Sequence, residues 1–507
     1  MVRHGRLSKG CQVCRKRKIK CDQKLPACSQ CVKAGWKCPQ YADSVDRMFQ
    51  YQPTRDSKSS LPATTIKSNL TDTHGTKVHE LSLCKLPKQI IQPVQCRAID
   101  FFLQTHTFQE NGVIRGHYEY LPAFSHEITT DTQVVTSLTA VALAAYAYKF
   151  QYPELLDAAR RQYVYSLRYM KDALSCHEKA VEDNTLISVL LLNTYEGLTC
   201  ETKASLPHRE AHLKGAMTIL ALRDRGLVRS RRGLQLFRQT SLCLTLSCLI
   251  HSLRVPAGLM DLHLVSAGYM DTGEPAWRLS DVMIKLAGFR ADIREAVLCD
   301  PGNIIQAAGA IDAELLCLEG DMVAKMPFQT LSAAEKSDLV WDTYYHVYPD
   351  LWAAAAWNHV HSCRIVLHSE IKSQLETILA TSPDSFSPAD AQQYEQCRLT
   401  LQHLTSEICA SMPQYCDYLP LLSDGTQQQP KARENEISYG NNQSSAIPTT
   451  AGIYQFFWPL LNAGQVTQSQ SQRDWIIDRC RYMGRMSGIQ QAYALAEILE
   501  DGTGMMC

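Results

Sequence analysis

One stretch of this 507-residue sequence carries cysteine at regular intervals: residues 11–38, CQVCRKRKIKCDQKLPACSQCVKAGWKC. It contains two copies of the pattern C-x2-C-x6-C, joined by six residues. The segment has too few apolar residues to bury six thiols in a core of its own. The spacing therefore predicts a metal site, whose ligands are Cys11, Cys14, Cys21, Cys28, Cys31 and Cys38.

Six cysteines satisfy two zinc ions only when two thiolates bridge both metals, because zinc prefers four tetrahedral ligands. The internal symmetry makes Cys11 and Cys28, the first cysteine of each copy, the natural bridges. The other two cysteines of each copy then complete one metal site each. The alternatives are a single zinc with two spare thiols, which leaves the repeat unexplained, and three disulfides, which are rare in the reducing interior of cells.

The basic residues are concentrated in the same region. Lysine plus arginine and aspartate plus glutamate balance at 51 each over the whole chain. Residues 1–40, however, hold 11 Lys/Arg against one acidic residue, Asp22. A basic N-terminal segment on an acidic remainder indicates that this segment alone binds a polyanion.

Five of the six residues between Cys14 and Cys21 are lysine or arginine. Bound metal would hold this short segment at both ends. A helix held in this way can enter the major groove of DNA, where lysine and arginine donate to guanine O6 and N7. Such a run is also typical of a nuclear localisation signal, a use that does not exclude DNA binding.

Residues 11–38 resemble the binuclear zinc cluster of fungal Zn2Cys6 transcription factors. The likeness covers the six cysteines, the basic run 15–20, Asp22 and Pro26. It implies two Zn²⁺ ions bridged by Cys11 and Cys28, and double-stranded DNA with CGG-type half-sites as the partner. It also assigns the principal base contact to Lys18, with Arg17 beside it.

The other basic residues of the segment are expected to contact DNA phosphates, which gives affinity and salt dependence without sequence information. They are Arg15, Lys20, Lys33 and Lys37. Lys16, in the basic run 15–20, is also expected to bind DNA.

Changes in composition predict three parts. Residues 1–45 are expected to form the DNA-binding domain with its basic flank, and residues 46–93, rich in Pro, Ser and Thr, a disordered linker. Residues 94–507 are expected to form a large all-α regulatory domain. Prolines interrupt every apolar heptad in the linker, so a homodimer, where one forms, is not expected to use a linker coiled coil.

Apolar residues follow the helical period through most of the third part. Helices are expected over 131–150, with Asp131 as the N-cap, and over 153–175, with a proline in the first turn. The same period predicts helices over 183–199, 208–223, 231–254, 279–298, 303–324, 350–380, 388–411, 470–483 and 487–500. The sequence shows neither an alternating strand pattern nor a glycine motif for nucleotides.

Several stretches of the helical body resemble the region of the same family called fungal-specific transcription factor domain 2. They are 190–196, 212–216 leading to 225–226, 357–359 with 364–365, 458–460, and 475–476 with 488–489. Within this body, residues of about 423–450, rich in Gln, Asn and Ser, are expected to form a disordered loop.

The sequence contains no constellation of catalytic residues and no motif for an organic cofactor. His208 and His212 stand at i and i+4, but no third metal ligand is identifiable, so a structural pair is expected. The apolar stretches 132–148 and 239–253 are short or interrupted, which favours buried helices over membrane spans. The 14 cysteines outside the cluster are expected to be buried small apolar residues.

The leading hypothesis is a nuclear, sequence-specific regulator of RNA polymerase II-type transcription. Its expected partners are the transcription machinery or co-regulators, and no membrane association is expected. By family analogy, it would control a metabolic or secondary-metabolite gene set. The alternative is a metabolite-sensing receptor whose helical body binds a small effector and whose output is DNA binding. An enzyme fused to a zinc module is not expected.

Overall fold

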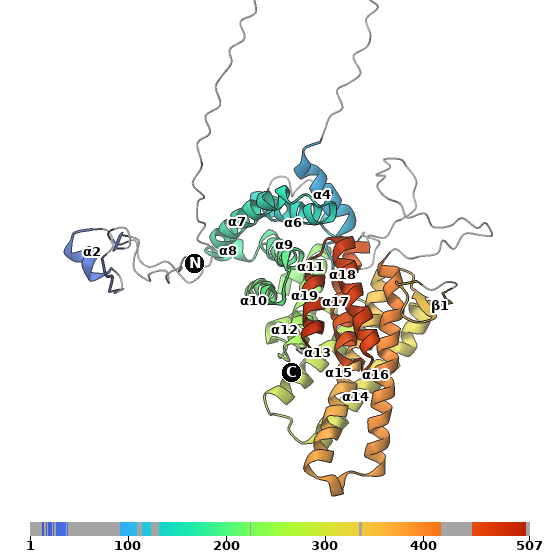
Figure 1. Ribbon diagram of the computed structural model, residues 1–507. Coiled ribbons are helices and arrows are strands. Elements are labelled where there is room, and N and C mark those ends of the chain that lie inside the picture. Colours follow the sequence, from blue (N-terminus) through green and yellow to red (C-terminus); the bar gives the residue numbers. More distant parts are fainter. Residues whose placement is uncertain are drawn as a thin grey trace, which may run out of the picture. The chain divides into compact units, whose positions relative to one another are not determined.

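A computed structural model divides the chain into two compact units, Met1–Leu86 and Pro87–Cys507 (Figure 1). The residues that the structure describes are 13–14, 17, 19–22, 24, 27–36, 38, 92–108, 114–122, 131–223, 225–333, 337–416 and 449–502. The expected linker over 46–93 lies outside them apart from residues 92–93, and so does the expected loop over 423–450 apart from residues 449–450.

The second unit consists almost entirely of helices. The α-helices are α4 (Val94–Thr105), α6 (Thr132–Phe150), α7 (Glu154–Leu174), α8 (His177–Ala180), α9 (Asp183–Thr199), α10 (Leu206–Leu222), α11 (Arg231–Ile250), α12 (Ala257–Ser266), α13 (Pro275–Arg294), α14 (Pro301–Lys325), α15 (Leu351–Thr381), α16 (Pro388–Tyr415), α17 (Thr449–Val466), α18 (Gln470–Ser487) and α19 (Gln491–Asp501). Three short 3-10 helices join them: η2 (Lys203–Ser205), η3 (Arg225–Arg229) and η4 (Pro383–Ser385).

The predicted zinc module followed by a helical body is confirmed, and the helical period located most of the body's helices. Helix α9 spans the predicted range, and Asp131 caps α6 by accepting from the backbone N–H groups of Gln133 at 2.8 Å and Val134 at 3.1 Å. The sequence analysis missed α4, α8, α12 and the start of α17. Helix α12 has only 10 residues, and α17 begins inside the range expected to be a loop.

One β-hairpin departs from the all-α prediction. Strands β1 (Gln329–Ser332) and β2 (Tyr344–Val347) pair antiparallel, with Gln329 opposite Val347. Each strand has four residues, which is too short for an alternating pattern to stand out in the sequence. Glu407 of α16 holds the hairpin, since it accepts from the Tyr344 hydroxyl and from His346 Nε2, both at 3.1 Å.

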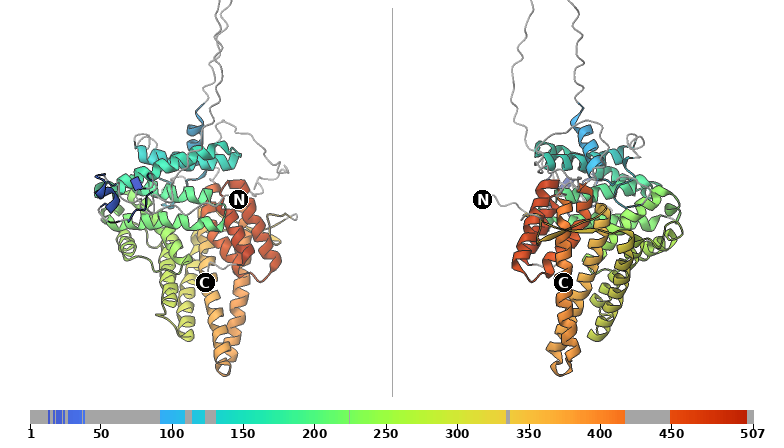
Figure 2. Two further views of the ribbon diagram at one scale, coloured as in Figure 1. Left: turned by 60° about the vertical axis from the view of Figure 1, so that its left-hand side comes forward. Right: turned by 90° about the vertical axis from the view of Figure 1, so that its right-hand side faces the viewer.

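Antiparallel neighbours build the framework of the second unit. Helices α6 and α7 pack together near α9, and α13, α14, α15 and α16 pack in sequence order. In Figure 2, α15 and α16 form a long pair that is joined at η4 and extends away from the other helices of this unit.

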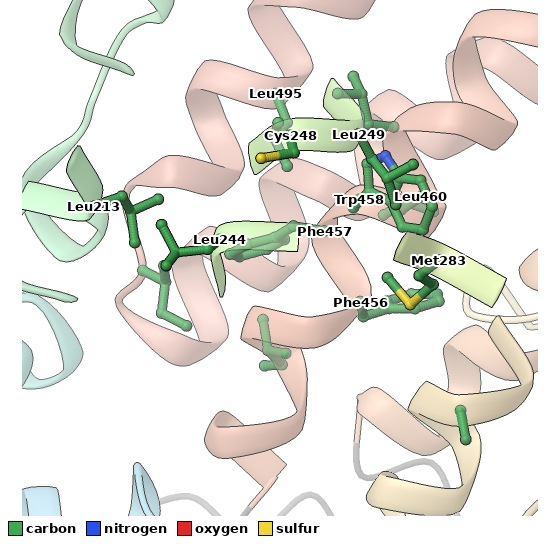
Figure 3. Packing of buried hydrophobic residues seen from close by; sticks show 14 of the residues in the cluster. Leu213, Leu244, Cys248, Leu249, Met283, Phe456, Phe457, Trp458, Leu460 and Leu495 are labelled. Atoms are coloured by element: carbon green, nitrogen blue, oxygen red, sulfur yellow. The ribbon is translucent and has the colours of Figure 1, made fainter. Parts of the chain in front are cut away.

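Helix α17 lies at the centre of the core. It contacts α4, α15, α16, α18 and α19, and its residues 456–458 are at most 6% exposed. Figure 3 shows Phe456, Phe457 and Trp458 beside side chains of α11, α13 and α19. A largely apolar helix is expected in such a position, because neighbouring helices cover it on several faces.

The long apolar stretches lie in α6 and α11, whose side chains are largely buried in this core. Among the described helices, none is long and apolar enough to cross a membrane.

Within the described part of the second unit, the cysteines form no disulfide bonds. Those that are buried, as expected, are Cys200, Cys248, Cys363, Cys397, Cys409, Cys416 and Cys480. The expectation is wrong for Cys96, Cys299 and Cys317, which are exposed. These three lie on amphipathic helices or at a helix end, where the sequence pattern alone does not separate an exposed thiol from a buried one.

Glu407→Gln tests how strongly the hairpin is held. Burial raises the pKa of Glu407, but the hydrogen bond from His346 and the nearby histidines outweigh it and bring it from 4.5 to about 2. A carboxyl whose folded pKa is lowered stabilises the fold above its unfolded pKa, and this stabilisation is lost as the pH falls from about 4.5 towards 2. We expect the variant to lower the free energy of unfolding at pH 7 by about 1–3 kcal/mol.

Urea unfolding at a series of pH values measures this effect, and the wild-type decline in stability below pH ~4.5 should become shallower in the variant. Glu395→Gln, on the exposed side of the same helix, is the control and should change little. Identical pH profiles for the wild type and Glu407→Gln would contradict the assignment.

Candidate metal centre and nucleic-acid interface

Five of the six predicted ligands lie close together in the first unit. Cys14, Cys28 and Cys31 are fully buried, and Cys21 and Cys38 are half-buried around them. The sixth, Cys11, lies outside the described residues. These thiols take the place of a hydrophobic core in a segment that is otherwise polar.

Cys28 lies where the ligand groups meet. Its Sγ is 3.7 Å from Sγ of Cys14, and two sulfurs on one tetrahedral zinc at 2.3 Å are about 3.8 Å apart. Cys28 belongs to one group with Cys14 and Cys31 and to another with Cys21 and Asp22, and the ligand atoms within each group lie within 4.8 Å of one another. A sulfur shared by two groups fits a bridging thiolate, and the described sulfurs fit zinc.

The two cysteine copies fold alike. In the first copy, the N–H of Ile19 donates to the carbonyl of Cys14 at 3.1 Å. At the equivalent place in the second copy, the N–H of Trp36 donates to the carbonyl of Cys31 at 2.9 Å. The sequence repeat is therefore a structural repeat, which supports the inference that the two halves share the metal sites symmetrically.

Helix α2 (Ser29–Lys33) begins at the central sulfur. Cys28 is its N-cap, and its Sγ accepts from the N–H of Cys31 at 3.4 Å. Asp22, the single acidic residue of the basic segment, accepts from the N–H of Ser29 at 3.0 Å. Hydrogen bonds with the side chain of Ser29 and, to a smaller extent, with its backbone N–H lower the pKa of Asp22. The backbone hydrogen bond joins the end of the first copy to the start of the second.

A contact between the copies that the sequence analysis missed involves Arg17 and Trp36. The Arg17 guanidinium lies over the Trp36 ring, 3.7 Å from its centre, which is the geometry of a cation–π interaction. Trp36 is the single aromatic residue of residues 11–38, and this could have been the signal for a structural role. One face of the Arg17 guanidinium is thus occupied within the unit.

The structure describes only some of the predicted DNA-binding residues. Arg17, Lys20 and Lys33 are exposed. Those that lie outside the described residues are Arg15, Lys16, Lys18 and Lys37. The described cations thus lie on the surface of the unit, where a polyanion can reach them.

In the second unit, His212 of the expected histidine pair lies among other protein side chains. Its Nε2 lies 3.1 Å from the Tyr163 hydroxyl and 3.8 Å from Glu196 Oε1, whereas the side chain of His208 lies outside the described residues.

Gly488 has a φ of +81°, and a Cβ added there would lie 2.8 Å from the backbone nitrogen of Lys149. Only glycine meets both conditions, which explains its place at the end of α18.

Comparisons with known proteins agree with the N-terminal geometry. Residues 9–48 match the fungal Zn(2)-Cys(6) binuclear cluster domain. A protein of Saccharomyces cerevisiae described as an uncharacterized transcriptional regulatory protein is 40% identical over 70 residues, which are 13% of this chain and 5% of that relative. The match thus spans only a small part of the curated relative. No solved structure matches the chain.

These findings confirm the predicted zinc-cluster domain with zinc as its metal. The domain implies DNA binding, and the relative that matches this part of the chain is described as a transcriptional regulatory protein. The family match ends at residue 48, so the resemblance of the helical body to a fungal regulatory domain stays a prediction.

Metal analysis of the purified chain tests the bridged arrangement. We expect two zinc ions per chain, because six thiolates serve two tetrahedral ions when two of them bridge. Cys28→Ser should lose both ions, since both sites share this sulfur, whereas Cys38→Ser should mainly weaken one.

Plasma mass spectrometry of the dialysed protein measures the zinc content. Cys96→Ser, an exposed cysteine of the helical body, is the control and should keep both ions. A wild-type content of one zinc per chain would rule out the bridged cluster.

Proposed function

We propose that this protein is a sequence-specific DNA-binding transcription factor that acts in the nucleus and reads CGG-like triplets through the basic segment of its first cysteine copy. The observation that carries the proposal is the cysteine cluster around Cys28, within a segment that matches the fungal Zn(2)-Cys(6) domain. DNA is the polyanion whose recognition suits a small, rigid and strongly basic unit.

Metal binding explains how so small a unit could hold a fixed shape. Bound zinc supplies the folding free energy that a short polar segment cannot obtain from apolar burial. The six cysteines, Cys11 included, would hold the metal pair with Cys11 and Cys28 as bridges. The chain's part is to present the thiolates from two equivalent turns and to keep the basic side chains outside.

The basic residues divide by what they can contact. Lys18 is proposed as the residue that reads a guanine, because it lies in the segment held at both ends by metal ligands. Arg17 keeps its N–H edge for DNA while its face rests on Trp36. The exposed Lys20 and Lys33 suit phosphates, as do Arg15, Lys16 and Lys37 of the same basic segment.

The helical body is proposed as the regulatory part, of the fungal-specific transcription factor domain 2 type, that contacts the transcription machinery or co-regulators. Its large buried core suits a stable platform, and any homodimer would form through it rather than through a linker coiled coil. Control of a metabolic or secondary-metabolite gene set follows only from family analogy.

A second candidate function is favoured by a specific observation within the body. A cavity lies between α9, α10, α11, α17 and α19, with polar atoms at its wall that have no hydrogen-bond partner in the described structure. The body would then be a receptor for a small effector, and DNA binding would be its output.

Lys18→Ala tests the reading of bases. A lysine that donates to a guanine edge contributes about 1–3 kcal/mol of discrimination, so the variant should lose about that much affinity on a CGG duplex and little on a scrambled one. Lys33→Ala should weaken both duplexes alike and reduce the salt slope by about one, because it removes a phosphate contact.

Fluorescence anisotropy with both duplexes at several fixed salt concentrations measures these effects. Lys171→Ala, an exposed lysine of α7 in the helical body, is the control and should bind like the wild type. Equal losses on CGG and scrambled DNA for Lys18→Ala would show that Lys18 contacts the backbone rather than a base.

A further inference from the structure

The second unit contains a cavity of about 170 Å³ between helices from two distant parts of the chain. One part supplies α9, α10, α11 and the loop at Gly116 and His117, and the other supplies α17 and α19. An apolar cavity of about 150 Å³ is known to accept benzene, so this space accommodates a ligand built on one small ring or a branched chain.

Most of the wall is apolar. Its apolar side chains include Leu190, Leu213, Leu246, Phe457, Trp458 and Leu495. Figure 3 shows four of them, Leu213, Phe457, Trp458 and Leu495, in the region where α17 meets α11 and α19. Such a surface favours a compact apolar body over a sugar or a nucleotide.

Three buried polar side chains of the wall lack partners for one atom each. Asn193 is 4% exposed, Gln455 7% and His117 9%. Asn193 Oδ1, Gln455 Nε2 and His117 Nε2 have no hydrogen-bond partner among the described residues. Unpaired buried polar atoms are rare in folded proteins, and several at one cavity indicate that something else binds there, either a ligand or ordered water.

Arg209 gives the cavity its charge. Its Nη1 donates to the side-chain oxygen of Gln491, and its buried Nε has no partner among the described residues. Within the described structure, no carboxylate lies at ion-pair distance from Arg209. Glu210, the neighbouring acid, instead contacts His251 Nε2 at 2.8 Å.

The buried histidine of the wall, His117, does not add to this charge. Burial lowers the pKa of His117 to about 4, so its ring is neutral at pH 7. The cavity wall thus combines apolar side chains, unpaired neutral polar atoms, the Glu210–His251 contact, and Arg209, which has no carboxylate at ion-pair distance among the described residues. A guanidinium beside apolar walls favours a bound anion, because a low local dielectric strengthens Coulomb attraction and a charged donor makes a strong hydrogen bond to a carboxylate.

We propose that this cavity binds a small monocarboxylic acid with a compact apolar body, its carboxylate on Arg209 and its remaining polar groups on Gln455 and Asn193. This inference rests on the second candidate function, a body that senses a small molecule, and it names the site and the chemical class of the ligand. The bound acid would join α17 and α19 to α9, α10 and α11 and so stabilise the body against unfolding.

Benzoate binding to the full-length protein tests the proposal, with benzamide as a neutral molecule of the same size. We expect benzoate to raise the melting temperature in a saturable way and to bind at least about 10-fold more tightly than benzamide in calorimetry. Arg209→Gln should weaken benzoate by about 10- to 100-fold and leave benzamide nearly unchanged. Arg161→Gln, an exposed arginine of α7, is the matched control and should bind benzoate like the wild type.

A second variant keeps the test valid if Arg209→Gln does not fold. Leu246→Phe adds volume to the wall from α11 without touching Arg209, and it should abolish binding of both benzoate and benzamide. Circular dichroism and the melting curve without ligand show whether each variant is folded.

Several results would overturn the proposal. They are the absence of benzoate binding, equal affinity for benzamide, or benzoate binding that Arg209→Gln and Leu246→Phe leave intact. If a metabolite mixture stabilised the wild type and Leu246→Phe equally, the body would bind a small molecule at a place other than this cavity, and the proposed site would be wrong. Binding to CGG duplexes, measured on the same protein, decides separately whether the DNA-binding function stands.

Discussion

The preference of zinc for four tetrahedral ligands, supplied here by cysteine thiolates, is the constraint on which the N-terminal unit depends. A segment with one aromatic residue and few aliphatic ones cannot offset its loss of conformational entropy by apolar burial. The buried sulfurs of Cys14, Cys28 and Cys31 occupy the place that leucines have in a larger domain. The same requirement leaves the lysines and arginines outside, because metal and thiolates fill the interior.

In the helical body, the burial of α17 among other helices holds the core together, as the metal ligands do in the N-terminal unit. This helix follows a long gap in the described chain, yet it contacts helices from the beginning, the middle and the end of the unit. Its aromatic side chains at 456–458 are almost fully covered. Helix α17 also lines the cavity, together with α19.

The cavity arises from ordinary helix packing. Large apolar side chains from α11 and α17 leave a space between them, and several polar side chains at its wall have an atom without a hydrogen-bond partner among the described residues. Unpaired groups of this kind lower stability, so a protein that retains them either fills the space with water or uses it for a ligand.

The sequence by itself determined the metal centre, because metal coordination depends on ligand type and local spacing, and six cysteines within 28 residues leave few arrangements. It also determined most helices, since the apolar period is a local property, as at α9 and α6. Only the tertiary structure decided that Trp36 supports Arg17, that Glu407 holds a β-hairpin, and that Arg209 meets Gln491 beside a cavity. These contacts join residues that are distant in the chain or follow no periodic pattern, and they exist only once each unit has folded.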